Sequence, residues 1–181
     1  MLGRLLIAAL LAKVLTVMAA ASSLAGVPSA DDAFLDDLEG RWIMRGTLGG
    51  KPVTYDAVGQ RVLSGAWLKF HMSDSGKPPR YQADVFLGYD AKARDFIVHW
   101  LDQFGAAGGR VVATGHRDGE QLVFTFPYAE GAFRDTFQRD KQKGTWTLLL
   151  ESQRKDGTWS TFANYNLTRP TGHQIDAPTH W

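Results

Sequence analysis

Hydrophobic and polar residues alternate through most of the chain from Trp42 to Arg169, which is typical of β-strands with one buried face. Leu68 and Phe70, for example, are separated by Lys69 and followed by His71. Turn residues interrupt the alternation at short intervals, and no helical period lies between them. The pattern predicts about ten strands, at residues 42–48, 53–62, 66–73, 81–89, 96–102, 110–116, 121–128, 133–140, 145–153 and 159–169.

The turns indicate how these strands connect. Gly49-Gly50 and Asp118-Gly119 are strong signals for two-residue hairpins, and the segment 74–79 is a loop because its prolines lack ladder donors. Short sequential connections favour a closed meander over a Greek-key sandwich, and closure removes exposed sheet edges. We therefore predict an all-β fold, a single antiparallel up-and-down barrel of about ten strands.

The ends of the chain differ from this pattern. Residues 1–30 read as a signal peptide cleaved after Ala25 or near Ala30, which predicts a periplasmic or secreted protein. An uncleaved membrane anchor is the alternative, but Lys13 interrupts the apolar run. Residues 31–38 predict a short N-terminal helix that caps one end of the barrel or crosses its mouth. The barrel domain spans 31–170, and 171–181 is a loose tail.

Composition excludes several classes of protein. The 181 residues carry a net charge of +1, so no nucleic-acid partner is expected, nor stable membrane insertion after leader removal. The chain has no cysteine, which excludes a disulfide framework. No paired histidines suggest a metal site, and the common nucleophile and phosphate-binding motifs are absent.

Strand parity predicts which side chains face the barrel interior, and a slip of one residue would invert the choice. Barrels of this size hold a small ligand unless aromatic side chains fill them. Tyrosine hydroxyls would orient such a ligand between apolar walls. The predicted cavity lining is Met44, Leu68, Phe70, Tyr81, Val85, Leu87, Phe124, Phe126, Leu148, Leu150 and Tyr165.

A set of short motifs, taken in order and spacing, resembles a bacterial family of secreted lipocalin-like proteins without an assigned function. The motifs lie within residues 38–169 and are Gly40-Arg41-Trp42, Gly88-Tyr89-Asp90, Trp100-Leu101-Asp102, Asp118-Gly119 and Asp156-Gly157-Thr158-Trp159, followed by Tyr165 and Arg169. The wider calycin group pairs a tryptophan on the first strand with a basic residue on the last. The resemblance therefore implies a structural cation–π contact between Trp42 and Arg169 that locks barrel closure.

A related ten-stranded barrel family binds haem through a histidine near the C-terminal end of the barrel. Its opening motif carries further glycines, whereas this chain has GRWIMRG at residues 40–46, and no histidine lies in the last three predicted strands. We therefore expect no haem and no other cofactor.

The histidines and carboxylates that could act as acids, bases or metal ligands also have ordinary structural interpretations. His71 and His99 lie in mid-strand, but His71 faces solvent, and His99 lies on the opposite face from Asp102. The strand carboxylates are interpreted as ordinary solvated positions; they are Asp84, Asp102, Asp135 and Glu151.

Three hypotheses follow. The first is a binding module that holds a small apolar or amphipathic molecule in the barrel. The second is an enzyme that uses the same cavity, with His99, Asp102 or a tyrosine as acid or base; we consider an enzyme the weaker hypothesis. The third is an envelope interaction protein with a filled core and a homodimer interface at Phe96–Asp102, a strand that is apolar on both faces. Either the N-terminal helix or a second subunit would cover that strand.

Overall fold

The computed structural model describes residues 31–171, so the predicted signal peptide and nearly all of the predicted tail lie outside the described residues. Two short 3-10 helices, η1 (Ala33–Leu38) and η2 (Gly108–Arg110), accompany ten strands. The strands are β1 (Gly40–Leu48), β2 (Lys51–Val62), β3 (Trp67–Asp74), β4 (Gln82–Asp90), β5 (Asp95–Asp102), β6 (Val112–Asp118), β7 (Gln121–Phe126), β8 (Phe133–Asp140), β9 (Thr145–Gln153) and β10 (Trp159–Thr168). Within the described part of the chain, no helix has the length and apolarity needed to cross a bilayer.

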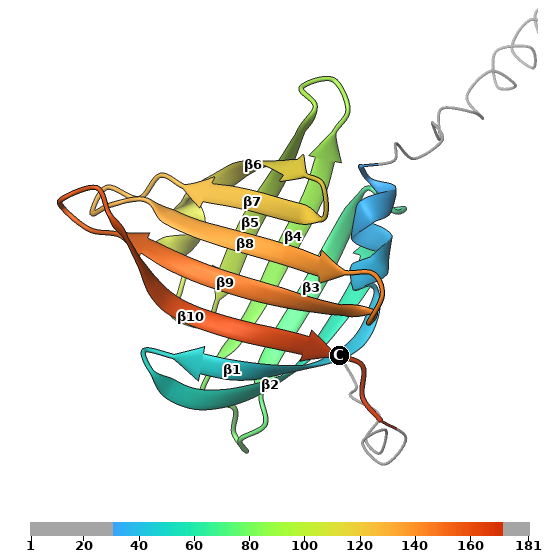
Figure 1. Ribbon diagram of the computed structural model, residues 1–181, viewed down its shortest axis with the longest axis horizontal. Helices are drawn as coiled ribbons and strands as arrows, with labels where there is room; N and C mark the ends of the chain where they lie inside the picture. The colour runs from blue at the N-terminus through green and yellow to red at the C-terminus, as the bar shows by residue number, and fades with distance from the viewer. Residues whose placement is uncertain (1–30, 172–181) are drawn as a thin grey trace, which may run out of the picture.

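Each strand pairs antiparallel with its neighbours in sequence, and β1 pairs with β10, so the sheet closes (Figure 1). In the closing pair, Met44 lies opposite Leu167 and Leu48 lies opposite Ala163. The prediction of an all-β, single closed antiparallel barrel of ten strands is confirmed. Closure gives every strand two hydrogen-bonded neighbours, which removes the exposed edges of an open sheet.

The predicted strand limits differ from the observed ones by at most two residues, and two of the differences have clear causes. β6 begins at Val112 rather than at residue 110, because Gly108–Arg110 form the helical turn η2. β7 ends at Phe126 rather than at residue 128, because Pro127 has no N–H for the ladder.

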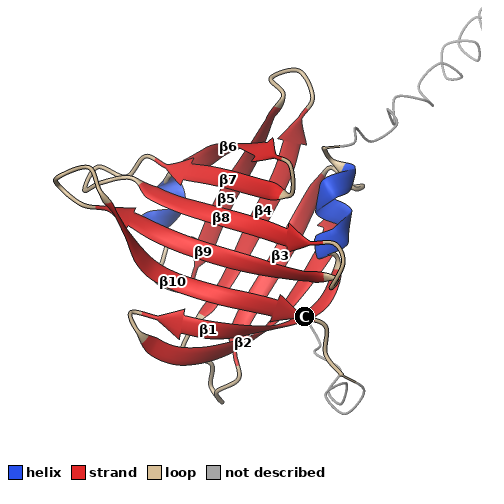
Figure 2. Cartoon of the chain, in the orientation of Figure 1, coloured by secondary structure: helices blue, strands red, loops and turns tan. Residues whose placement is uncertain are grey.

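The short helix η1 lies against the end of the barrel at which β10 finishes (Figure 2). Its side chains Phe34, Leu35 and Leu38 are buried in the core. The guanidinium carbons of Arg139 and Arg117 lie 4.0 and 4.2 Å from the centroid of the Phe34 ring. We call this the closed end of the barrel, because apolar and cationic side chains together seal it.

Aromatic side chains fill the half of the barrel next to η1. The ring centroids of Phe124 and Phe137 are 6.2 Å apart, and those of Phe70 and Phe137 are 6.5 Å apart, both in edge-to-face geometry. Trp42 and Trp146 are each 2% exposed, and Trp146 meets Phe34 of η1 edge to face. The barrel is therefore no open channel. A pocket of about 470 Å³ with a mostly charged lining lies outside this packed half, beside Trp42 and Trp146, and a larger apolar one lies toward the other end.

The contact between β2 and η1 depends on Gly59. A Cβ atom at this position would lie 2.0 Å from the backbone oxygen of Leu38, so Gly59→Ala must displace the end of η1. We expect a loss of about 1 to 3 kcal/mol in the free energy of unfolding, measured by urea denaturation. Gly108→Ala is the control, since a Cβ there meets nothing within 4 Å. Equal stability of the two variants would contradict this packing.

Candidate functional site: a cavity at the open end of the barrel

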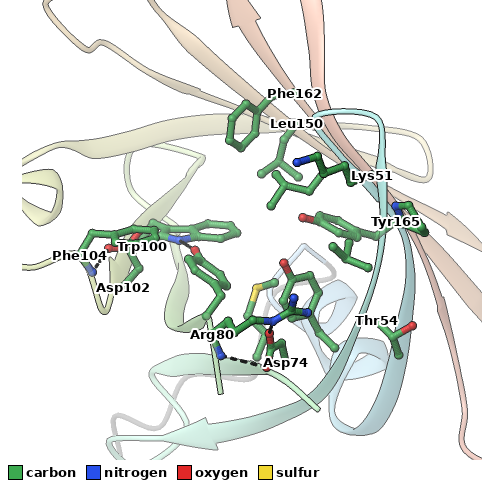
Figure 3. Close-up of a pocket in the computed structure, with 16 residues that line it drawn as sticks. Lys51, Thr54, Asp74, Arg80, Trp100, Asp102, Phe104, Leu150, Phe162 and Tyr165 are labelled. Carbon is green, nitrogen blue, oxygen red and sulfur yellow. Dashed lines mark hydrogen bonds and ion pairs between the residues drawn. The ribbon is translucent and has the colours of Figure 1, made fainter. Parts of the chain in front are cut away.

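The end of the barrel opposite η1 holds a cavity of about 550 Å³. The hairpin between β1 and β2 and the loops after β3 and β5 form its rim, while β9 and β10 supply a wall. Trp100 and Tyr165 point into it from opposite sides (Figure 3). The lining residues are Leu48, Lys51, Pro52, Val53, Thr54, Tyr55, Met72, Asp74, Arg80, Tyr81, Trp100, Asp102, Phe104, Leu150, Phe162 and Tyr165.

Three tyrosines from separate parts of the chain meet at this cavity. The ring centroids of Tyr55 and Tyr165 are 5.6 Å apart, and those of Tyr55 and Tyr81 are 5.9 Å apart. The indole N–H of Trp100 donates to the Tyr81 hydroxyl at 3.0 Å. Burial raises the pKa of all three phenols, so each stays neutral and able to donate a hydrogen bond across the physiological range.

One ion pair fixes the rim of the cavity. Asp74 Oδ1 accepts the backbone N–H groups of Gly76 and Arg80, at 2.9 and 3.0 Å. Asp74 Oδ2 accepts Arg80 Nε at 2.9 Å. The Arg80 backbone N–H lowers the pKa of Asp74 more than any other group does, so this carboxylate is ionised and ties together the loop from β3 to β4.

A smaller pocket of about 180 Å³ adjoins the cavity. Both are lined by Tyr81, Trp100, Asp102, Leu150 and Phe162, so the two spaces lie next to each other. The other residues of the smaller pocket are Phe126, Tyr128, Phe133 and Asp135.

Asp135 is the unusual residue of the smaller pocket. It is only 2% exposed, and its Oδ1 has no hydrogen-bond partner among residues 31–171. Burial raises the pKa of this carboxyl to about 8. The interpretation of Asp135 as a solvated strand position is wrong, because β8 turns it inward between Phe124 and Leu150 on the neighbouring strands. The sequence does carry the signal, since Asp135 alternates in phase with Phe133 and Phe137.

Phe162 reaches both spaces because of a β-bulge. The register between β9 and β10 shifts between Thr161 and Ala163, which leaves Phe162 without a partner in the ladder. Its ring lies 5.2 Å from that of Phe133, in edge-to-face geometry. Strand parity alone could not place this residue, because a bulge inserts one residue and re-aims the side chain.

The predicted lining residues all come from inward-facing positions but divide into two groups. Tyr81, Leu150 and Tyr165 line the large cavity, and Phe126 lines the small pocket together with Tyr81 and Leu150. The others lie in the packed core and outside both hollow spaces; they are Met44, Leu68, Phe70, Val85, Leu87, Phe124 and Leu148. Trp100, Phe162 and Asp135 are among the lining residues that sequence reasoning missed.

The closure pair implied by the resemblance lies at the opposite end from the cavity. The Arg169 guanidinium carbon is 3.5 Å from the centroid of the Trp42 ring. The guanidinium donates to the carbonyls of Asp37, Glu39 and Arg41, and the Trp42 indole N–H donates to Leu38 O at 2.8 Å. Arg169, which directly follows β10, thus holds the segment that links η1 to β1.

His71 and His99 lie on the outside of the barrel wall. His71 Nδ1 is 2.7 Å from Asp84 Oδ1, and His99 Nε2 donates to the backbone oxygen of Gly109 at 2.6 Å. Asp102 lies at the cavity, so the structure does not bring His99 and Asp102 together as an acid–base pair. Glu151 accepts two hydrogen bonds from Arg134. Across residues 31–171, no group of three or more His, Asp or Glu side chains is placed to hold a metal ion.

The strand that is apolar on both faces, β5, is covered in part by its own loop. The turn η2 contacts β5, and a Cβ at Gly109 would meet the side chain of Leu101 at 2.8 Å. The N-terminal helix η1 contacts β2 and β3, so of the two alternatives for covering β5 the structure does not support the helix.

The comparisons with known proteins bear on the fold. No protein-family model matches the sequence, and no curated protein matches it at a significant level. The crystal structure of Rv2717c from M. tuberculosis is similar, with a TM-score of 0.53 and 14% sequence identity. The match covers 80% of this chain and 100% of that chain. At this sequence identity, the similarity shows a shared fold and nothing further.

Proposed function

We propose that this protein binds a small apolar or amphipathic molecule in the cavity at the open end of its barrel. The observation that carries the proposal is the cavity of about 550 Å³ at the open end, which has mostly apolar and aromatic walls, whereas the pocket at the closed end is lined mainly by charged side chains. Cavities of roughly 300 to 1,000 Å³ with mostly apolar walls are typical of small-molecule sites.

The walls support the same conclusion. Side chains such as Met72, Leu150 and Phe162 offer apolar surface, and the neutral hydroxyls of Tyr55 and Tyr165 offer a few oriented hydrogen bonds. A ligand that is mainly apolar, with one polar group, would satisfy both.

The proposal extends to the setting in which the protein works. The resemblance to secreted lipocalin-like proteins and the predicted signal peptide at residues 1–30 favour a carrier or sensor that acts in the periplasm or outside the cell. A homodimer through Phe96–Asp102 stays a prediction, and Leu101 on that strand is 38% exposed.

The test is a substitution that fills the cavity without altering its rim. Leu150 lines both hollow spaces, so Leu150→Trp should occupy them with an indole and weaken binding of the neutral fluorescent probe N-phenyl-1-naphthylamine by at least about tenfold. Leu149→Trp is the matched control, because the neighbouring position faces outward and is absent from the lining of either space.

The readout is the rise in probe fluorescence on titration, with urea unfolding to verify that both variants fold. Native mass spectrometry of the protein isolated from its own compartment then identifies the natural ligand. Equal probe affinity in the wild type and Leu150→Trp, with both proteins folded, would rule out the cavity as the binding site.

A further inference from the structure

The smaller pocket has a composition unlike that of a general apolar cavity. Six of its nine lining residues are aromatic, two are carboxylic acids and the last is Leu150. The aromatic residues are Tyr81, Trp100, Phe126, Tyr128, Phe133 and Phe162. The two cationic residues that line the larger cavity, Lys51 and Arg80, do not line this pocket.

The rings are held in fixed orientations by one another. Phe126 and Tyr128 stack with centroids 5.8 Å apart and an interplanar angle of 6°, and Phe133 meets Phe162 edge to face. Trp100 is fixed by its hydrogen bond to Tyr81. Aromatic faces carry negative electrostatic potential, so several of them around one small space attract a cation.

Two carboxylic acids line the pocket together with the rings, one near its rim and one deep in its wall. Asp102 lies toward the rim, where its Oδ1 accepts the backbone N–H of Phe104 at 3.0 Å. Asp135 lies deep in the wall, and its Oδ1 has no partner among the described residues. A buried polar atom without a partner costs stability, so a ligand that pairs with it gains the corresponding free energy.

We propose that this aromatic pocket binds the alkylammonium group of an amphipathic ligand, paired with the Asp135 carboxylate, while the apolar body of the ligand occupies the larger cavity. The inference rests on the proposed function and names the chemical class of its ligand. A volume of about 180 Å³ suits a head group rather than a whole drug-sized ligand, and the adjoining space accepts the remainder.

Other head groups match the pocket less well. An anion would meet two carboxylic acids and no lysine or arginine. A neutral hydroxyl could pair with Asp135 but would make no use of the six aromatic rings. An alkylated ammonium uses both features, because its positive charge pairs with the carboxylate and its alkyl groups pack on the rings.

Binding of a cation should depend on pH through Asp135. This carboxyl is neutral at pH 6, because burial holds its pKa near 8, and a cation binds its ionised form more tightly. The affinity for a permanently charged cation should therefore rise as the pH increases toward 8.

The other groups around Asp135 do not produce this dependence. Strands β7 and β9, which flank it, present apolar side chains such as Phe124 and Leu150. The phenols of Tyr81, Tyr128 and Tyr165 have pKa values raised by burial and stay neutral over this range. The remaining charged groups of the two spaces are Asp102, Asp74, Arg80 and Lys51.

The experiment compares three probes with the same alkyl chain by isothermal titration calorimetry, below their critical micelle concentrations. They are octyltrimethylammonium, octan-1-ol and octyl sulfate. At pH 8 the ammonium should bind at least about tenfold tighter than the alcohol, and the sulfate should bind most weakly. At pH 6 the ammonium should bind at least about tenfold more weakly than at pH 8, with the alcohol unchanged.

Two variants locate the effect in the pocket. Asp135→Asn should remove the pH dependence and the preference for ammonium, whereas Asp56→Asn, at an exposed position on β2, should preserve both. If Asp135→Asn does not fold, Tyr128→Leu tests the rings: it should weaken ammonium binding several-fold and leave alcohol binding within about twofold.

The outcomes separate this inference from the proposed function. If the alcohol binds as tightly as the ammonium at pH 8, or if Asp135→Asn keeps the full pH dependence, the ammonium assignment is wrong. Binding of the alcohol that Leu150→Trp abolishes would still support the cavity as a ligand site. Failure of all three probes to bind would overturn both proposals.

Discussion

Asp135→Asn is expected to remove a steep pH dependence from the stability of this protein. In the folded protein, burial raises the pKa of Asp135 to about 8, whereas a carboxyl in the unfolded chain titrates near pH 4. Between these values the folded state keeps a proton that the unfolded state has released. Stability should therefore fall as the pH rises from about 4 to about 8, by up to about 1.4 kcal/mol per pH unit, and then level off.

The total loss across this window is on the order of 5 kcal/mol, a large part of the stability of an ordinary domain. The asparagine variant has no proton to lose, so its stability should stay flat where that of the wild type declines. Urea unfolding at pH 5, 7 and 9 measures both curves. Parallel curves for the wild type and the variant would mean that Asp135 titrates as an ordinary exposed carboxyl. Asp56→Asn, at an exposed strand position, should follow the wild type.

Trp42→Ala should produce the other large effect, a loss of about 4 to 6 kcal/mol in the free energy of unfolding. The side chain is 2% exposed, its N–H bonds to Leu38 O, and its ring lies under Arg169. Truncation leaves a large void at the closed end and an unpaired carbonyl. Urea denaturation measures the loss. Trp159→Ala is the matched control, and it should cost less because Trp159 is only half-buried. Equal losses in the two variants would contradict a special role for Trp42 in closure.

The contribution of Arg169 can be separated from that of the buried ring. A double-mutant cycle of Trp42→Leu and Arg169→Ala should give a coupling energy of about 1 kcal/mol from the cation–π contact. Arg169→Lys should lose most of the stability that Arg169 provides. An ammonium cannot reproduce the planar set of guanidinium N–H groups that donate to the carbonyls of Asp37, Glu39 and Arg41. Full stability in the lysine variant would show that charge alone is sufficient.

The contact between Trp42 and Arg169 also shows what the hydrophobic pattern within one strand cannot predict. The two residues lie at opposite ends of the domain sequence, yet β1 pairs with β10 and brings them together. The hydrophobic alternation within each strand could not show that pairing. The short sequential connections predicted it, because they favour closure, whereas the resemblance implied only the contact of the two side chains, whose ring and guanidinium lie 3.5 Å apart.

Local signals in the sequence are sufficient to predict the strands, their turns and the face that each strand presents to the interior. This is because a period of two and turn residues such as Gly49-Gly50 and Asp118-Gly119 act over a few neighbouring residues. Inward positions such as Leu68 and Val85 were therefore assigned correctly as buried. Asp135 and Asp102 are exceptions: both are interpreted as solvated from their residue type, yet Asp135 is buried in phase with its inward neighbours and Asp102 lines the cavity.

Where the barrel is packed and where it is hollow follows from its three-dimensional fold. The depth of a side chain along the barrel axis depends on strand tilt and register, which come from pairing between strands and not from the pattern within one strand. Leu148 and Leu150 share a face of β9, yet Leu150 lines the cavity and Leu148 lies in the filled core. The bulge that brings Phe162 to Asp135 is likewise a property of the paired strands.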